Sequence, residues 1–265
     1  MEYSKIYDLL GFSSISKQVF TSQIELPISF IEQSPQTYGF LPALVPIWRE
    51  DNDFIGYWRH WFCEKRPTTI VQQHPEYNYE TEEIARNFHQ LLVDTFLRKI
   101  AASEEGINES LLKICKVLGL DINAIKKHYD KYGDSFENYQ NFVCFQNQEP
   151  LIHGGAAYNG SFPNGISTEL HNVCSVELND EIKAVLKNLN NVPIWLLSND
   201  QEPIFYSLIE NNDLSGAWLS LNSNGWEFSA AKKAIMHLAN ASQDQKFRQL
   251  AQVWATQEHE RYGEY

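Results

Sequence analysis

The pattern of apolar and polar residues divides the chain into helical stretches around a β-rich region. Near the N-terminus, apolar residues at helical spacing occupy 6–10, and the pair Ser13-Ser14 interrupts them. The segment 26–31 predicts a second short helix, because its proline stands in the first turn, where a missing N–H costs little. We therefore expect the chain to begin with helices.

The pattern then changes to short runs rich in β-branched and aromatic residues. Strands are predicted over 44–49, 54–62 and 68–72, with turn residues between them. Pro46 places the first strand at a sheet edge or near the start of the strand, because proline donates no hydrogen bond to a neighbour. The strand 54–62 carries large aromatic side chains on both faces, which predicts a central strand covered on both sides.

Capping residues mark the helices that follow. Thr81 is expected to cap a helix that runs to about residue 100, with two glutamates in its first turn. The helices 109–118 and 122–132 each follow an Asn or Asp and end before a glycine. A further helix is expected over 135–146. Later in the chain the same signals predict helices over 180–189, 229–239 and 244–262.

The tetrapeptide Val-Pro-Ile-Trp occurs twice, at 45–48 and 192–195. Each copy is followed at the same distance by Asn-Asp and then by an aromatic segment. One strand–turn–strand unit used twice would explain this, although chance and common hairpin sequences would also produce it. Strands are accordingly predicted over 193–197, 204–210 and 217–222. The expected fold class is α+β, with a mixed or largely antiparallel sheet, helices packed on it and, if the repeat is a true duplication, two similar units.

These elements suggest three segments in a chain of 265 residues, a length that suits two domains. Residues 1–105 would form an α+β domain. Residues 106–148 would be a helical insertion or linker. Residues 149–265 would form a second α+β unit, a divergent repeat of the first if the duplication is real.

The formal net charge of −13 is shared by both halves of the chain. Such a field repels phosphate backbones and anionic lipid surfaces, so neither nucleic acid nor a membrane is expected as a partner. A basic protein would be attracted. An acidic surface that only keeps the protein in solution remains the alternative.

Cysteine spacing and the N-terminus bear on the compartment. The four cysteines, at 63, 115, 144 and 174, include no Cys-x-x-Cys pair, which favours free thiols in a reducing cytoplasm. The first residues lack the pattern of a signal peptide, and no apolar run approaches the length of a membrane span. A cytoplasmic location is therefore expected.

The sequence contains few patterns typical of catalytic or metal-binding sites. The loop that begins at His153 resembles the glycine-rich loops that supply oxyanion-hole N–H groups, but no Gly-x-Ser-x-Gly accompanies it. A hydrolase using His153 stays as an alternative. The histidines show no metal-ligand spacing, and His259 is expected in a solvated tail. No catalytic residue, cofactor or metal is predicted, and the protein is not expected to be an enzyme.

Two clusters suit a protein partner. Three acids lie in the turn after the first strand. Such a cluster is typical of a solvated turn, of a site for a hard cation or of a contact for a basic partner. On the next strand, period-2 alternation predicts that a Tyr, an Arg and a Trp share one face, and these residue types are enriched at binding hot spots. The predicted partner-binding residues are Glu50, Asp51, Asp53, Tyr57, Arg59 and Trp61.

The order of elements over about 75 residues adds a family expectation. It consists of the Leu-Pro-led segment 26–31, the proline-containing strand 44–48, the acidic turn 51–53, an aromatic strand, the short strand 69–74, and a helix with Phe88, Leu91, Leu92, Phe96 and Leu97 on one face. This order resembles the SUKH superfamily, which includes bacterial immunity proteins of polymorphic toxin systems and a yeast family of cell-wall-synthesis regulators.

The resemblance covers under a third of the chain. It implies an α+β fold and a non-enzymatic role in which one surface binds and blocks a toxin domain. The leading hypothesis is therefore an immunity protein that neutralises a basic toxin. A scaffold or regulatory protein of cell-wall or envelope synthesis is the alternative from the same family.

Overall fold

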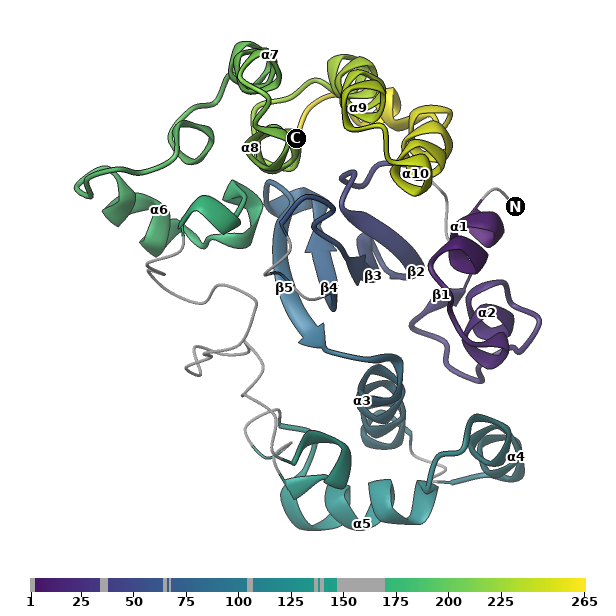
Figure 1. The fold of residues 1–265 in the computed structure, drawn as a ribbon. Coiled ribbons are helices and arrows are strands. Elements are labelled where there is room, and N and C mark those ends of the chain that lie inside the picture. Colours follow the sequence, from purple (N-terminus) through teal and green to yellow (C-terminus); the bar gives the residue numbers. More distant parts are fainter. Residues whose placement is uncertain are drawn as a thin grey trace.

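The computed structural model places a five-stranded antiparallel sheet among helices, which confirms the α+β class (Figure 1). It describes residues 3–33, 38–63, 66, 68–103, 107–135, 138, 141–146 and 170–265. The strands follow one another across the sheet in chain order. They are β1 (Glu32–Gln33), β2 (Leu44–Glu50), β3 (Asp53–Trp58), β4 (Thr69–His74) and β5 (Glu80–Ala85).

Helices cover this sheet on several sides. In Figure 1, α7 to α10 lie over one end of the sheet, α1 and α2 lie beside it, and α3 to α5 lie below it. The α-helices are α1 (Tyr3–Leu9), α2 (Ser14–Phe20), α3 (Phe88–Ala101), α4 (Glu109–Leu118), α5 (Ile122–Tyr132), α6 (Asp180–Leu186), α7 (Glu202–Glu210), α8 (Leu214–Leu221), α9 (Phe228–Ser242) and α10 (Gln245–Ala255). Short 3₁₀ turns include η1 (Pro75–Tyr77), η3 (Val143–Phe145), η5 (Ser175–Glu177), η6 (Ile194–Leu196) and η7 (His259–Tyr262).

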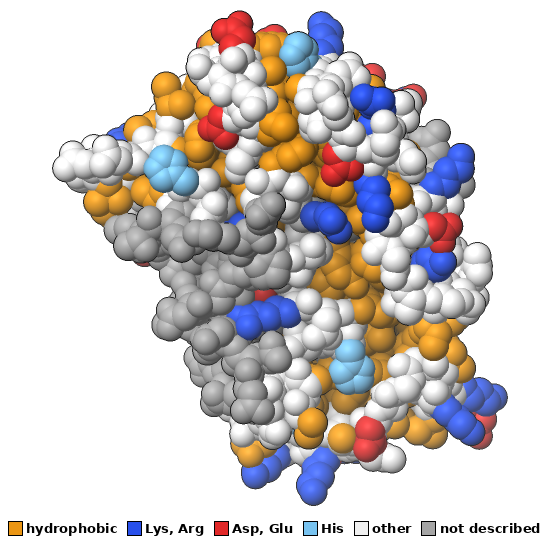
Figure 2. All heavy atoms as spheres, viewed as in Figure 1, with side chains coloured by type: hydrophobic (Ala, Val, Ile, Leu, Met, Phe, Trp, Pro, Cys, Tyr) orange, Lys and Arg blue, Asp and Glu red, His pale blue; other side chains and the backbone are white. Residues whose placement is uncertain are grey.

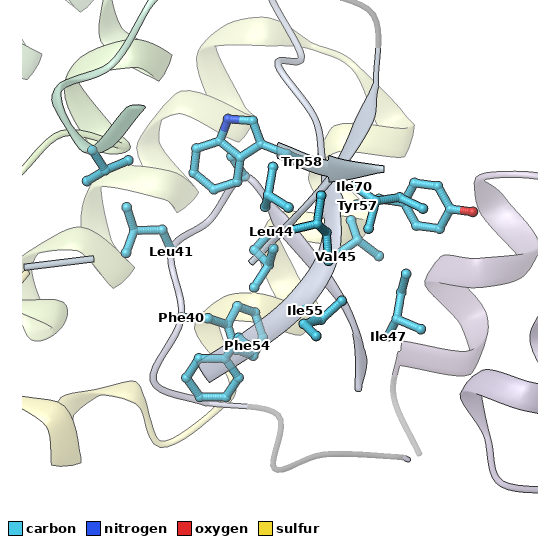
Figure 3. Packing of buried hydrophobic residues seen from close by; sticks show 14 of the residues in the cluster. Phe40, Leu41, Leu44, Val45, Ile47, Phe54, Ile55, Tyr57, Trp58 and Ile70 are labelled. Carbon is cyan, nitrogen blue, oxygen red and sulfur yellow. The ribbon is translucent and has the colours of Figure 1, made fainter. Parts of the chain in front are cut away.

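The central position of β3 explains its aromatic sequence. It lies between β2 and β4, and four of its six side chains are large and buried on one face or the other: Phe54, Ile55, Tyr57 and Trp58. Figure 3 shows these side chains pointing to both sides of the strands, with Tyr57 extending toward the N-terminal helices. The prediction of a central covered strand is therefore confirmed, although the strand ends at Trp58 and not at residue 62.

Pro46 behaves as its chemistry requires. A bulge between Pro46 and Trp48 interrupts the pairing of β2 with β3, and β1 pairs only with Trp48 and Arg49 on the other side of β2. Among the described residues, no strand pairs with Pro46 on that second side, where its missing N–H would break a ladder. Pro46 lies near the start of β2, which confirms one of the two predicted positions.

The helix from Thr81 is the first correction. Residues 80–85 form β5, and α3 begins only after Asn87, whose side chain accepts a hydrogen bond from Gln90 N. From Glu80 to Glu83, half-exposed and buried residues alternate with a period of two, and Glu83 is completely buried. The Thr69 hydroxyl and the Arg86 guanidinium donate to the Glu83 carboxylate, so a glutamate that favours a helix start is stable inside the sheet.

The second copy of the tetrapeptide is the second correction. Residues 194–196 form η6, and the segments predicted as strands over 204–210 and 217–222 lie in α7 and α8. The run Ile204-Phe205 followed by Leu208-Ile209 has helical spacing, and Pro203 stands in the first turn of α7. The two copies therefore adopt different structures, because their flanking residues have different periods.

Of the other local predictions, most helices are confirmed and two are wrong. Asn108 and Gly119 flank α4, and Asp121 and Gly133 flank α5, as predicted. The helices predicted near 180, 229 and 244 are present as α6, α9 and α10. The segment 26–31 is not helical, and the described residues of 135–146 show 3₁₀ turns, among them η3, in place of a full helix.

One hydrophobic core joins the sheet to the C-terminal helices. Ala43 N donates to the Asn222 side chain at 2.8 Å, and Trp254 Nε1 donates to Phe40 O at 3.1 Å. His259 was expected in solvent, but it is completely buried, so this prediction was wrong. The division into segments at residues 105 and 148 stays a prediction, because packing alone does not show which segments fold independently.

Candidate functional site

The turn between β2 and β3 holds the three predicted acids. Glu50 at the end of β2 pairs with Asp53 at the start of β3. Asp51 at the tip has φ 50°, a left-handed conformation that Asp and Asn adopt more readily than most residues. The Asp53 carboxylate accepts a hydrogen bond from His74 Nδ1 at 2.8 Å. This hydrogen bond joins the acidic turn to the end of β4.

Three more acids lie at the same end of the sheet. Glu80 and Glu82 belong to β5 and pair with residues of β4. Glu76 in η1 accepts a hydrogen bond of 2.6 Å from Asn52 Nδ2 in the β2–β3 turn. We call this group the acidic edge, and it consists of Glu50, Asp51, Asp53, Glu76, Glu80 and Glu82.

Charges within the acidic edge perturb one another. Burial raises the pKa of Glu82, and the neighbouring Glu80 and Asp53 raise it further, against the opposing effect of His74. Burial alone would lower the pKa of His74, but the hydrogen bond and charge of Asp53 outweigh it and raise this pKa. The Glu82 carboxylate therefore lies close enough to Glu80 and Asp53 to be repelled by their charges.

Part of this charge is already compensated inside the protein. Arg98 Nη1 donates to the Glu50 carboxylate at 2.8 Å, and Arg49 Nη2 donates to Asn52 Oδ1 at 3.0 Å. Asp51, by contrast, is exposed at the tip of the turn. The outer side of the acidic edge is consequently the side that an approaching cation would meet.

An exposed aromatic side chain stands beside these acids. Tyr77 in η1 is 70% exposed, and its ring centroid lies 6.3 Å from that of His74. It follows Glu76 directly, and the left-handed Asn78 turns the chain back toward β5. Tyr77, Glu76 and the two acids of β5 were not predicted as site residues, because a helix was expected from Thr81 in place of the β4–β5 hairpin. The strand-ending sequence Pro-Glu-Tyr-Asn was the available signal.

The predicted face of Tyr57, Arg59 and Trp61 does not form as expected. Tyr57 is 9% exposed and stacks on Phe12 at 4.5 Å, and burial raises its pKa. Arg59 and Trp61 lie beyond the end of β3, so strand alternation does not apply to them. The Arg59 guanidinium lies 4.3 Å from the Trp61 ring centre, and a cavity of about 190 Å³ is lined partly by Tyr57 and Arg59.

These residues are also separated from the acids. Asp53 and Trp58 are the two ends of β3, which at about 3.3 Å per residue puts the two predicted groups roughly 17 Å apart. The structure brings Glu50, Asp51 and Asp53 together. It places Tyr57, Arg59 and Trp61 at the other end of the strand.

A buried cluster around Glu177 is the other concentration of polar side chains. Glu177 accepts hydrogen bonds from Arg66 Nη2 at 2.6 Å, Trp58 Nε1 at 2.8 Å and His60 Nε2 at 3.0 Å. Burial would raise the pKa of Glu177, but Arg66 and His60 hold it far below its usual range. The ligand atoms of His60, Cys174 and Glu177 lie within 4.8 Å of one another, a spacing that a metal ion could use.

Charge and protonation oppose a metal at this place. Arg66 already neutralises the carboxylate, and burial raises the pKa of the Cys174 thiol well above its usual value. A cation would have to displace the guanidinium and the thiol proton from a site without solvent. The cluster instead links the end of β3 to η5 and so joins distant parts of the chain.

Comparison with known proteins gives no family for this chain: no family model, curated protein or solved structure matches it. Within the described ranges, none of the helices combines the length and the apolar character needed to cross a membrane. His153, the residue of the alternative hydrolase hypothesis, lies outside the described residues.

Proposed function

We propose that the protein is a non-enzymatic cytoplasmic binding protein, an immunity protein of the SUKH-like type that neutralises a basic toxin domain. The observation that carries this proposal is the convergence of six carboxylates from the β2–β3 turn, η1 and β5 beside the exposed Tyr77. Acids around a protruding tyrosine are the arrangement that a lysine- and arginine-rich surface would complement.

Physical chemistry supports this pairing in two ways. Burial raises the pKa of Glu82 most, and the charges of Glu80 and Asp53 raise it further; the cations of a partner would relieve that repulsion. The net charge of −13 extends the attraction beyond contact distance and would speed association. Tyr77 would supply the apolar contact that charge alone does not give.

The test is affinity capture from the native host with three forms of the chain as bait. The first is the wild type. The second carries Asp51→Asn, Glu76→Gln and Glu80→Gln. The third, a control with the same net charge, carries Glu109→Gln, Glu202→Gln and Glu210→Gln, exposed acids of α4 and α7.

We expect the wild type and the control to retain one basic protein in near-equal amounts, and the acidic-edge variant to lose it. Equal capture by all three forms would show that the acidic edge is not the binding surface. Capture of envelope-synthesis proteins in place of a basic toxin would favour the scaffold function.

A further inference from the structure

A second concave surface lies between α3, α5 and η3 and shares no lining residue with the acidic edge. It encloses about 440 Å³ and is lined largely by apolar side chains, among them Val93 of α3, Ile125 of α5 and Phe142. Its volume falls within the range of small-molecule sites, about 300 to 1,000 Å³. Val143 at its border is 83% exposed, so the apolar lining continues to the protein surface.

The rim of this pocket is cationic in a strongly acidic protein, and Figure 2 shows lysine and arginine side chains at the lower end of the molecule, where α5 lies. Lys127 and Lys131 both line it, four residues apart on α5, and both are exposed. The neighbouring Lys126 differs, since it pairs with Asp130 at 2.6 Å. No such ion pair of Lys127 or Lys131 occurs within the described ranges. The Lys131 ammonium lies over the Tyr132 ring, 4.6 Å from its centre, a contact that leaves its charge unneutralised. The positive charge of both lysines can therefore pair with an anionic ligand.

Asp121 also lines the pocket, but its carboxylate is occupied. As the cap of α5 it accepts backbone hydrogen bonds from Asn123 at 3.0 Å and Ala124 at 3.1 Å. These bonds and the positive end of the helix dipole stabilise its charge where it stands. It offsets only part of the positive rim.

The inner wall carries no charge at neutral pH. His128 stacks on Phe142 with 3.7 Å between ring centres, and burial lowers its pKa. Burial also raises the pKa of the Cys144 thiol to about 11. Among the residues that the structure describes, His128 Nε2 has no hydrogen-bond partner, so this wall offers an aromatic surface with one ring nitrogen open to a ligand. The pocket thus combines an apolar interior with a positive entrance.

We propose that this pocket binds a small amphipathic carboxylate. Its apolar tail would lie against Val93, Ile125 and Phe142, and its carboxylate would meet Lys127 and Lys131 at the rim. An uncharged ligand would leave the lysines unused, and a cationic one would be repelled by them. This site is separate from the acidic edge and does not depend on the immunity function.

The test uses sodium octanoate as the probe, with octan-1-ol and octylammonium as eight-carbon controls, in isothermal titration calorimetry on the whole chain. We expect saturable 1:1 binding of octanoate, at least about tenfold tighter than that of either control. Replacing Lys127 and Lys131 together by Gln should weaken octanoate about tenfold and leave octan-1-ol unchanged.

A matched pair of tryptophan variants locates the site. Ala124 lines the pocket on α5, so Ala124→Trp should fill it and abolish binding. Ala184 is an exposed alanine of α6, and Ala184→Trp should bind octanoate as the wild type does. Circular dichroism and thermal melting confirm that each variant is folded. The proposal is overturned if octanoate shows no saturable binding up to about 10 mM, or if it binds the Ala124→Trp protein normally.

Discussion

His259 shows how far the surroundings of one side chain can depart from its local sequence. It stands between two glutamates near the end of the chain, yet it is completely buried. Its ring stacks on Trp254 at 4.2 Å, and its Nδ1 accepts a hydrogen bond from Gly39 N at 2.8 Å. Because Nδ1 is an acceptor, the neutral ring carries its proton on Nε2. Burial lowers the pKa of His259 to about 3.

This pKa predicts an acid-sensitive fold. His259 takes up a proton when the chain unfolds, because its pKa is about 3 in the folded protein and about 6.5 in an unfolded chain. The stability that it contributes is complete above about pH 6.5 and falls as the pH decreases toward 3. Between about pH 7.5 and about pH 5, this one group should remove about 2 kcal/mol from the free energy of unfolding.

Urea unfolding of wild type and His259→Asn over this pH range checks the prediction. The Asn variant can still accept the Gly39 hydrogen bond, and its free energy of unfolding should fall by about 2 kcal/mol less than that of the wild type. His89→Asn, at an exposed histidine of α3, serves as the control. His60 and His128, whose pKa values burial also lowers, should leave a residual slope in both proteins. Identical pH profiles for wild type and His259→Asn would contradict the assignment.

Among the elements, those defined by local signals were predicted well. The flanking residues of α4 and α5 act within one turn of the helix they cap, so the sequence contains the whole cause. β5 could not be recognised in this way, because its sequence resembles a helix start. What makes it a strand is pairing with β4 and the burial of Glu83 against Thr69 and Arg86, contacts that only the folded chain provides.

The pairing of β2 with β3 depends on one glycine. A Cβ atom at Gly56 would lie 2.4 Å from the carbonyl oxygen of Val45 and 3.0 Å from Pro46 Cα, atoms that belong to the backbone of β2. Because backbone cannot rotate away as a side chain can, the two strands would have to separate. Gly56→Ala should therefore cost about 3 kcal/mol of unfolding free energy.

Gly11 provides a control with a different constraint. It has a φ of +74° but open space around its Cα, so Gly11→Ala should cost roughly 1–2 kcal/mol from backbone conformation alone. Both variants are measured by urea unfolding with equal m-values. If Gly56→Ala proves no more costly than Gly11→Ala, the close approach of the two strands is not a tight constraint.

At the scale of the whole molecule, the candidate site combines predictable and unpredictable parts. The acidic turn could be found from sequence because its three carboxylates are nearly consecutive. The β4–β5 hairpin places Glu76, Tyr77 and Glu80 beside this turn. The sequence predicted the start of a helix at this hairpin. Tyr57 was expected on an open face, but it is buried because β3 is covered on both sides. Partner binding by Tyr57, Arg59 and Trp61 stays a prediction.

The distribution of charge over the whole molecule leads to a kinetic prediction for the captured basic partner. With wild type, the association rate measured by stopped-flow fluorescence should fall at least tenfold between about 20 mM and about 200 mM salt, because screening shortens the range of attraction. The variant with Asp51→Asn, Glu76→Gln and Glu80→Gln should associate slowly at low salt and respond weakly to added salt.

The control variant separates a local site from a general effect of net charge. Neutralising Glu109, Glu202 and Glu210 changes the net charge by the same amount but leaves the acidic edge intact. If the acidic edge directs the encounter, this variant should keep the association rate and salt dependence of the wild type within about twofold. If both triple variants are slowed equally, the attraction comes from the overall charge of −13, and the placement of the binding surface at the acidic edge is wrong.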